Sequence, residues 1–240
     1  MKIIITGGAS GIGLAISKAL LAQGHEVLIC YHRSAESAKA LEERYPNASI
    51  FEADVANTRD LDYLFAYGAK LFNGGADALI NNAGVSVADC FQNVSDEDFD
   101  RLMAVNFGAV YKACARAVPH MLAQQKGNII NISSIWGVHG ASTEALYSAS
   151  KAAVIALTQA LSSELGRSGI RVNCIAPGVI DTAMNANLSP EDREALRMAT
   201  PLERIGTGED VAGAVKFLLS DDAAFITGQT ITVDGGFLYG

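Results

Sequence analysis

The stretch that decides the fold is Lys2-Ile3-Ile4-Ile5-Thr6-Gly7-Gly8-Ala9-Ser10-Gly11-Ile12-Gly13. Its apolar first half is typical of a buried strand, and a helical pattern starts directly after the glycines. Gly7, Gly11 and Gly13 permit positive φ angles and let a pyrophosphate approach the backbone, and the helix behind them offers free N–H groups. The spacing is neither G-x-G-x-x-G nor a Walker A loop, and a tight turn without a ligand is the alternative.

Outward from this turn, strand-like runs alternate with helical stretches along the whole chain. The strand-like runs are 2–6, 26–31, 48–53, 78–81, 128–132, 171–176 and 230–233. The clearest helical stretches are 12–23, 35–45, 96–124, 146–166 and 210–219. Strands separated by helices need crossover connections, and the continuously apolar early strands are typical of sheets covered on both faces. We therefore predict a single α/β domain over residues 1–240, a Rossmann-type doubly wound parallel sheet with helices on both faces.

Composition excludes several other classes of protein. Of the 240 residues, 50% are hydrophobic and 18% charged, and the net charge is −8. This size suits one domain, and the acidic balance argues against nucleic-acid binding. The longest apolar run, Ala152–Leu157, is too short to span a membrane, and we expect no signal peptide. The cysteines and histidines show no metal-ligand spacing, so we expect no metal and a cytoplasmic location.

Five motifs, in order along the chain, resemble those of the short-chain dehydrogenase/reductase family. They are Thr-Gly-x-x-x-Gly-Ile-Gly at 6–13, Asn81-Asn82-Ala83-Gly84, Ser133-Ser134, Tyr147-x-x-x-Lys151, and Pro177-Gly178 with Thr182 beyond it. The resemblance covers essentially all 240 residues and implies an NAD(P)-dependent oxidoreductase. Doubly wound sheets bind ligands beyond the carboxyl ends of their strands, and these motifs follow predicted strands.

Tyr147 and Lys151 are four residues apart on a helical stretch and therefore share one face. A phenol has a pKa of about 10, which must fall by roughly three units for proton exchange near pH 7. A nearby ammonium and the positive nicotinamide ring can supply that field. The resemblance implies that Tyr147 is the general acid, that Ser134 binds the substrate oxygen, and that Lys151 lowers the tyrosine pKa and holds the nicotinamide ribose. It also implies that Asn106 positions a water for proton relay; Ser133 is the alternative to Ser134.

The end of the second predicted strand governs the choice of cofactor. NAD enzymes usually place a carboxylate there, but this chain has Tyr31, followed by Arg33 and Ser34, which can bind a 2′-phosphate. NADP(H) is therefore favoured, and NAD(H) stays the alternative. The expected cofactor contacts are Gly7, Ser10, Gly11, Ile12, Gly13, Tyr31, Arg33, Ser34, Asp54, Val55, Asn82, Ala83, Gly84, Tyr147, Lys151, Pro177, Gly178 and Thr182.

Residues 179–205 are expected to form a lid over the substrate. This lid and the C-terminal stretch 226–236 are similar to those of 3-oxoacyl-[acyl-carrier-protein] reductases. That similarity implies NADPH-dependent reduction of a ketone, a 3-oxoacyl thioester, to a secondary alcohol in fatty acid biosynthesis. In that subgroup arginines flank strands five and six, where this chain has Asn128 and Ser168; Arg167 and Arg171 lie close to the second position.

Two alternative functions stay open. The stretch 134–147 also resembles bacterial reductases that act on the ketone-bearing modified lysine of elongation factor P, in which case Trp136 would form a pocket wall. The other alternative is a non-catalytic NADP-binding sensor. Such proteins commonly lose the tyrosine or the lysine, whereas Ser134, Tyr147, Lys151 and Asn106 are all present here, which favours an enzyme.

The helical stretches 96–124 and 146–166 are rich in alanine and other small or apolar residues. Each has more apolar face than one sheet can cover. We therefore predict a homotetramer with these helices at one interface. The other expected partner is a small-molecule or carrier-borne carbonyl substrate, with no nucleic acid and no membrane.

Overall fold

In the computed structural model, which describes residues 1–185 and 188–239, seven parallel strands form one sheet in the order β3-β2-β1-β4-β5-β6-β7. The strands are β1 (Lys2–Thr6), β2 (Glu26–Tyr31), β3 (Ala48–Glu52), β4 (Ala78–Asn81), β5 (Gly127–Ile132), β6 (Ile170–Pro177) and β7 (Thr230–Val233). The strand order reverses between β1 and β4, which creates a crevice at their carboxyl ends. The predicted α/β fold with a doubly wound parallel sheet is confirmed.

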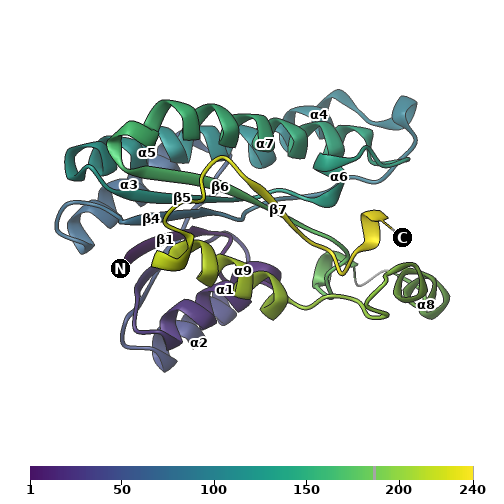
Figure 1. The fold of residues 1–240 in the computed structure, drawn as a ribbon, viewed down its shortest axis with the longest axis horizontal. Coiled ribbons are helices and arrows are strands. Elements are labelled where there is room, and N and C mark those ends of the chain that lie inside the picture. The colour runs from purple at the N-terminus through teal and green to yellow at the C-terminus, as the bar shows by residue number, and fades with distance from the viewer. Residues whose placement is uncertain (186–187, 240) are drawn as a thin grey trace.

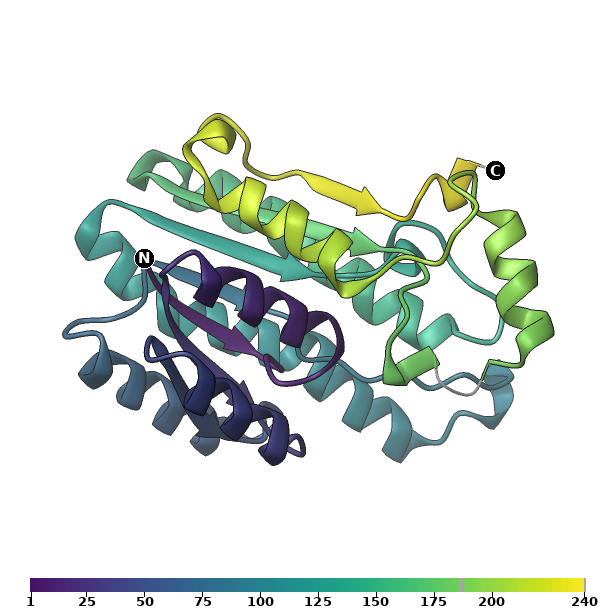
Figure 2. The ribbon, with the colours of Figure 1, turned by 90° about the horizontal axis from the view of Figure 1, so that it is seen from below.

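Helices cover both faces of the sheet (Figure 1). On one face lie α1 (Gly11–Ala22), α2 (Ala35–Arg44) and α9 (Gly208–Leu219); on the other lie α3 (Thr58–Leu71), α4 (Asp96–Met103), α5 (Ala109–Gln124) and α7 (Ala145–Leu165). The short helices α6 (Ile135–Val138) and α8 (Pro190–Ala199) lie at the end toward which the strands point (Figure 2). Single 3₁₀ turns are η1 (Phe91–Asn93), η3 (Gly166–Ser168), η4 (Ala183–Asn185), η5 (Asp221–Ala223) and η6 (Phe237–Tyr239).

Two elements differ from the sequence-based prediction. The expected helix 96–124 is divided by a π-helical turn, η2 (Ala104–Gly108), between α4 and α5. A π-turn accommodates one extra residue per turn, and here it carries the buried Asn106 toward the loop after β4. Helix α3 was not among the clearest helical stretches, because only three of its residues, Leu61, Leu64 and Gly68, are buried.

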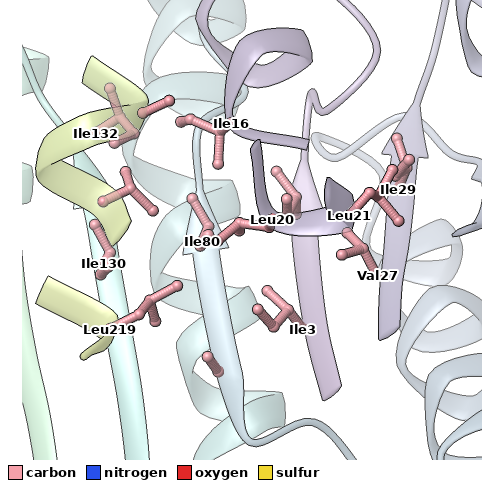
Figure 3. Packing of buried hydrophobic residues seen from close by; sticks show 14 of the residues in the cluster. Ile3, Ile16, Leu20, Leu21, Val27, Ile29, Ile80, Ile130, Ile132 and Leu219 are labelled. Atoms are coloured by element: carbon pink, nitrogen blue, oxygen red, sulfur yellow. The ribbon is translucent and has the colours of Figure 1, made fainter. Parts of the chain in front are cut away.

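The strands are apolar because both of their faces are covered. Ile3 and Ile5 of β1 pack with α1 and α9 on one side, as Figure 3 shows for this cluster, and Ile4 packs on the other side. All three are at most 2% exposed. Burying such a side chain stabilises the fold by about 1.5–3 kcal/mol. The consequence for the site is a rigid sheet that fixes the loops at its carboxyl edge.

The expected lid, residues 179–205, contains η4 and α8, while positions 186–187 lie outside the described residues. Its base is fixed to the following segment, because the Asp181 N–H donates to the Gly206 carbonyl at 2.8 Å. Arg193 of α8 forms a 2.8 Å ion pair with Asp181. Across the described part of the chain, no helix has both the length and the hydropathy that a membrane crossing requires.

Candidate active site

The turn between β1 and α1 is shaped so that only glycine fits at its key positions. Gly7 and Gly11 have φ angles of +64° and +48°. A Cβ at Gly13 would overlap the Gly7 carbonyl oxygen. Ser10 is the N-cap of α1, but its side chain caps no backbone N–H, and Ile12 packs against the core. The first N–H groups of α1 therefore stay available to an anion, which a helix N-terminus favours.

Hydrogen bonds join the loop after β4 to this turn. The Asn82 side-chain amide donates to the carbonyls of Thr6 and Gly7 at 3.2 and 3.0 Å. The Thr6 hydroxyl in turn accepts the N–H groups of Asn82 and Ala83. The sequence pattern alone assigns Thr6 no role. Its position opposite Asn81 in the parallel register of β1 and β4 is what gives it one.

Residues from β6 and the lid border the same crevice. The Gly178 N–H, just after Pro177, donates to the Val233 carbonyl at 3.0 Å. A Cβ at Gly178 would lie only 2.7 Å from the Asp234 Cβ, so this crossing needs glycine. A Cβ at Gly11 would lie 3.4 Å from the Thr182 methyl carbon, which places the lid beside the glycine turn.

The end of β2 forms the other end of the crevice. Tyr31 is buried, Arg33 is exposed, and Ser34 is the N-cap of α2. Within the described residues, Arg33 forms no salt bridge, so its guanidinium is available to a ligand. After β3, an Asp54 carboxylate oxygen accepts the Ala56 N–H at 2.9 Å, and Val55 is buried.

A cavity of about 110 Å³ lies at the carboxyl end of β5 and β6. Its lining residues are Ser86, Ser134, Ile135, Trp136, Glu144, Tyr147, Gly178, Val179 and Asn185. The Ser134 side chain hydrogen-bonds the Tyr147 hydroxyl group. Adjacent Ser133 instead donates to the Lys151 carbonyl at 2.8 Å and is buried. The geometry therefore separates the two serines: Ser134 faces the cavity, and Ser133 holds α7 against β5.

The pKa of Tyr147 differs from the sequence-based expectation. Its value is raised to about 12, mainly by burial, against the lowering effect of the Ser134 hydrogen bond and with a smaller contribution from the Glu144 carboxylate. Burial also lowers the pKa of Lys151 to about 8. The Lys151 ammonium nitrogen donates to the Ile132 carbonyl at 3.1 Å and lies 5.7 Å from the centre of the Tyr147 ring. Burial therefore dominates the pKa of Tyr147, and the phenol is protonated at neutral pH.

Asn106 of η2 is fully buried, and both its side-chain oxygen and its amide nitrogen form hydrogen bonds. Its side-chain oxygen accepts the Val85 N–H, and its amide donates to the Val85 carbonyl, both at 2.9 Å. The same amide donates to the Ser150 hydroxyl at 3.1 Å. A Cβ at Gly84 would lie 3.2 Å from the Lys151 nitrogen and 3.4 Å from the Asn106 oxygen. The loop that follows β4 therefore contacts both η2 and α7 at one point.

Comparisons with known proteins agree with this arrangement. Residues 7–238 match the family model described as enoyl-(acyl carrier protein) reductase. The chain is 37% identical over 237 residues to the 3-oxoacyl-[acyl-carrier-protein] reductase FabG of Staphylococcus aureus (strain Mu50), covering 97% of this chain and 96% of that protein. It is 39% identical over 242 residues to 3beta-hydroxysteroid dehydrogenase 1 of Eggerthella lenta, covering 98% and 92%. The solved structure of ElxO with NADP bound superposes with a TM-score of 0.92 at 32% identity, covering 100% of both chains.

The fold and the site together define an NAD(P)-dependent oxidoreductase with a doubly wound sheet. The chain belongs to the short-chain dehydrogenase/reductase family, and within it resembles the 3-oxoacyl-[acyl-carrier-protein] reductases.

Proposed function

We propose that this protein is an NADPH-dependent reductase that converts a ketone to a secondary alcohol. The observation that carries the proposal is the Ser134–Tyr147 pair at the wall of a cavity, next to the buried Lys151. Two further observations support the choice of NADPH. The similar ElxO structure has NADP bound, and Arg33 is exposed and unpaired among the described residues of this chain.

The residues of the crevice fit this cofactor. The glycine turn leaves room where any Cβ would intrude, and the open N-terminus of α1 suits the pyrophosphate. Arg33 and Ser34 would hold the 2′-phosphate, Asp54 and Val55 the adenine, and Lys151 the nicotinamide ribose. The remaining expected contacts would bind the parts of the cofactor between these points. When bound, NADPH supplies the hydride.

The side chains of the cavity account for the proton and for the developing charge. Tyr147, whose raised pKa keeps it protonated, donates its proton to the carbonyl oxygen of the substrate. Ser134 donates a hydrogen bond to the same oxygen, which stabilises the negative charge that develops there. Lys151 lies beside the Tyr147 ring and favours the phenolate once the proton has left. Asn106 holds the Val85 backbone and Ser150 next to Lys151, where a water for proton relay would bind.

A 3-oxoacyl thioester is the first candidate substrate, because FabG relatives match over nearly the whole chain. This assignment would place the protein in fatty acid biosynthesis in the cytoplasm. Arg171, which lies close in sequence to the position of one arginine of that subgroup, does not reach the cavity. Arg171 lies at the amino end of β6, opposite Asn128 and away from the cavity, and its guanidinium donates to the Leu218 and Ile226 carbonyls. It is therefore not free to bind an acidic carrier at the cavity mouth.

The ketone-bearing modified lysine of elongation factor P is the second candidate. The observation that favours it is the cavity wall, where Trp136 lies beside Ser134 and Tyr147, as the similarity of residues 134–147 implied. Trp136 also packs edge-on against Phe237 with ring centres 5.9 Å apart, which joins the C-terminal turn to this wall.

The test is the loss of NADPH absorbance with an acetoacetyl thioester as substrate. We expect oxidation of NADPH by the wild-type protein, and a loss of about 10²–10⁴-fold in kcat for Tyr147→Phe, because only the proton donor is removed. NADPH binding by the variant, followed by fluorescence, should be unchanged. Near-normal turnover by Tyr147→Phe would contradict its role. NADPH binding without oxidation would retain the cofactor but exclude the thioester, and other ketones would be tested next.

A further inference from the structure

Glu144 is a carboxylate in the cavity for which the proposed reaction has no use. It is the N-cap residue of α7, three positions before Tyr147, and lines the same cavity as Ser134 and Tyr147. The carboxylate is half-buried, and burial raises its pKa, while a hydrogen bond with the Trp136 side chain lowers it. Burying an ionised carboxylate beside an aromatic ring has a desolvation cost, which is offset when a positive group pairs with the carboxylate.

No cation of the described chain supplies that pairing. The cavity is lined by no lysine or arginine. The three arginines of the lid region each pair with a carboxylate of their own neighbourhood: Arg193 with Asp181, Arg197 with Glu194, and Arg204 with Asp210. Lys151 points instead to the Ile132 carbonyl. Within the described chain the Glu144 carboxylate therefore has no positive partner, and a cationic ligand would find it unpaired.

The segment that follows Ser86 of the cavity lining is acidic overall. Residues 86–101 carry the carboxylates of Asp89, Asp96, Glu97, Asp98 and Asp100 and one cation, Arg101. This segment is bonded to the loop that bears Glu144, because the Asp89 N–H donates to the Thr143 carbonyl at 2.8 Å. An excess of negative charge near Glu144 would favour a cationic ligand over an acidic carrier protein.

We propose that the substrate is a ketone that carries a protonated amine, and that Glu144 is the residue that binds its ammonium group. The proposal rests on the proposed ketone reductase function and defines its substrate class. Glu144 and Tyr147 face one cavity from the start of one helix, so a single small molecule or side chain can reach both with its amine and its carbonyl. The ammonium would form a charge-assisted hydrogen bond with the half-buried carboxylate, and the Trp136 ring would cover its carbon chain.

The experiment compares three ketones of one shape and different charge: 4′-(aminomethyl)acetophenone, 4′-ethylacetophenone and 4-acetylbenzoate. The aromatic ring prevents the amine from condensing with its own ketone. Binding of each to the protein–NADP⁺ complex is measured by calorimetry, and turnover by loss of NADPH absorbance. We expect the wild-type protein to bind and reduce the cationic ketone at least about tenfold better than the neutral one, with the anionic one poorest.

Glu144→Gln keeps the size and the hydrogen-bonding capacity of the side chain and removes its charge. In this variant the cationic and the neutral ketone should bind and be reduced about equally well, so that the ratio of their affinities falls to about one. The matched control is Glu97→Gln, which removes an exposed charge from α4 outside the cavity lining. This variant should keep most of the preference for the cationic over the neutral ketone. No preference for the cation in the wild-type protein, or an unchanged preference in Glu144→Gln, would overturn the proposal. Failure of the reductase function is distinguishable, because then none of the ketones is reduced while the binding ratio still reports on Glu144.

Discussion

At the scale of single residues, environment rather than residue type decides the role. Ser133 and Ser134 are neighbours of the same kind, yet one is bonded to the backbone of α7 and the other faces the cavity. Burial likewise moves the pKa values of Tyr147 and Lys151 in opposite directions, because it disfavours the charged form of each. The result is a protonated phenol, which suits proton donation to a carbonyl.

The choice of cofactor is a residue-scale prediction. Arg33→Ala should weaken NADPH binding by about 10–100-fold, because a hydrogen bond between a guanidinium and a phosphate contributes about 1.5–3 kcal/mol. NADH binding should change by less than about twofold, since NADH has no 2′-phosphate to lose. Fluorescence titration with both nucleotides measures this, with Lys39→Ala, an exposed cation on α2, as control. Equal weakening of both nucleotides would show that Arg33 does not bind the phosphate.

At the scale of elements, the β1–α1 turn is the part that tolerates least change. It is fixed from below by the Ser17 hydroxyl, which donates to the Gly8 carbonyl at 2.8 Å, and from the side by Asn82. The π-turn η2 is a second such element, because it places Asn106 where a regular helix would not. The β1–α1 turn depends on the positive φ angles of Gly7 and Gly11, and η2 on an inserted residue in an otherwise helical segment.

One glycine substitution in the turn and one control outside it test this. Gly13→Ala should lower the free energy of unfolding by about 1–3 kcal/mol and abolish NADPH binding, because its methyl group overlaps the Gly7 carbonyl. Gly213→Ala in the middle of α9 meets no atom within 4 Å and should stabilise the protein by up to about 1 kcal/mol. Urea unfolding and nucleotide titration distinguish the two. Unimpaired NADPH binding by Gly13→Ala would mean that the turn is not the phosphate site.

At the scale of the whole molecule, the parallel sheet gathers groups that are far apart in sequence. The carboxyl ends of β1, β4, β5 and β6 lie at one edge, and α8 of the expected lid lies at the same end of the molecule (Figure 2). On the face of the sheet that α7 covers, this helix presents a row of exposed small residues: Ala149, Ala152, Ala156 and Ala160. Small residues allow another helix to approach closely.

The homotetramer stays a prediction, and this surface tests it. Ala156→Arg should convert the tetramer into a smaller species, because the long charged side chain blocks close helix packing. The folded chain itself should be little affected, since Ala156 is exposed. Light scattering coupled to gel filtration measures the mass. Ala40→Arg, an equally exposed alanine on α2 at the other face of the sheet, should leave the mass unchanged. A wild-type monomer at micromolar concentration would contradict the prediction.

The sequence by itself determined the fold and most of the crevice. The sequence patterns that predicted them are local: the glycine spacing, the apolar strands and the Tyr147–Lys151 spacing. Local patterns can be recognised because neighbouring residues determine the local backbone geometry. Four strands were predicted with both ends correct, and the other three to within one residue at each end. Only the tertiary structure decided which serine faces the cavity, that Thr6 joins two strands, that Arg171 is bonded away from the cavity, and that Glu144 lines it. These features depend on burial and on contacts between distant segments. A pKa shift or a charge partner arises only when folding brings those segments into contact.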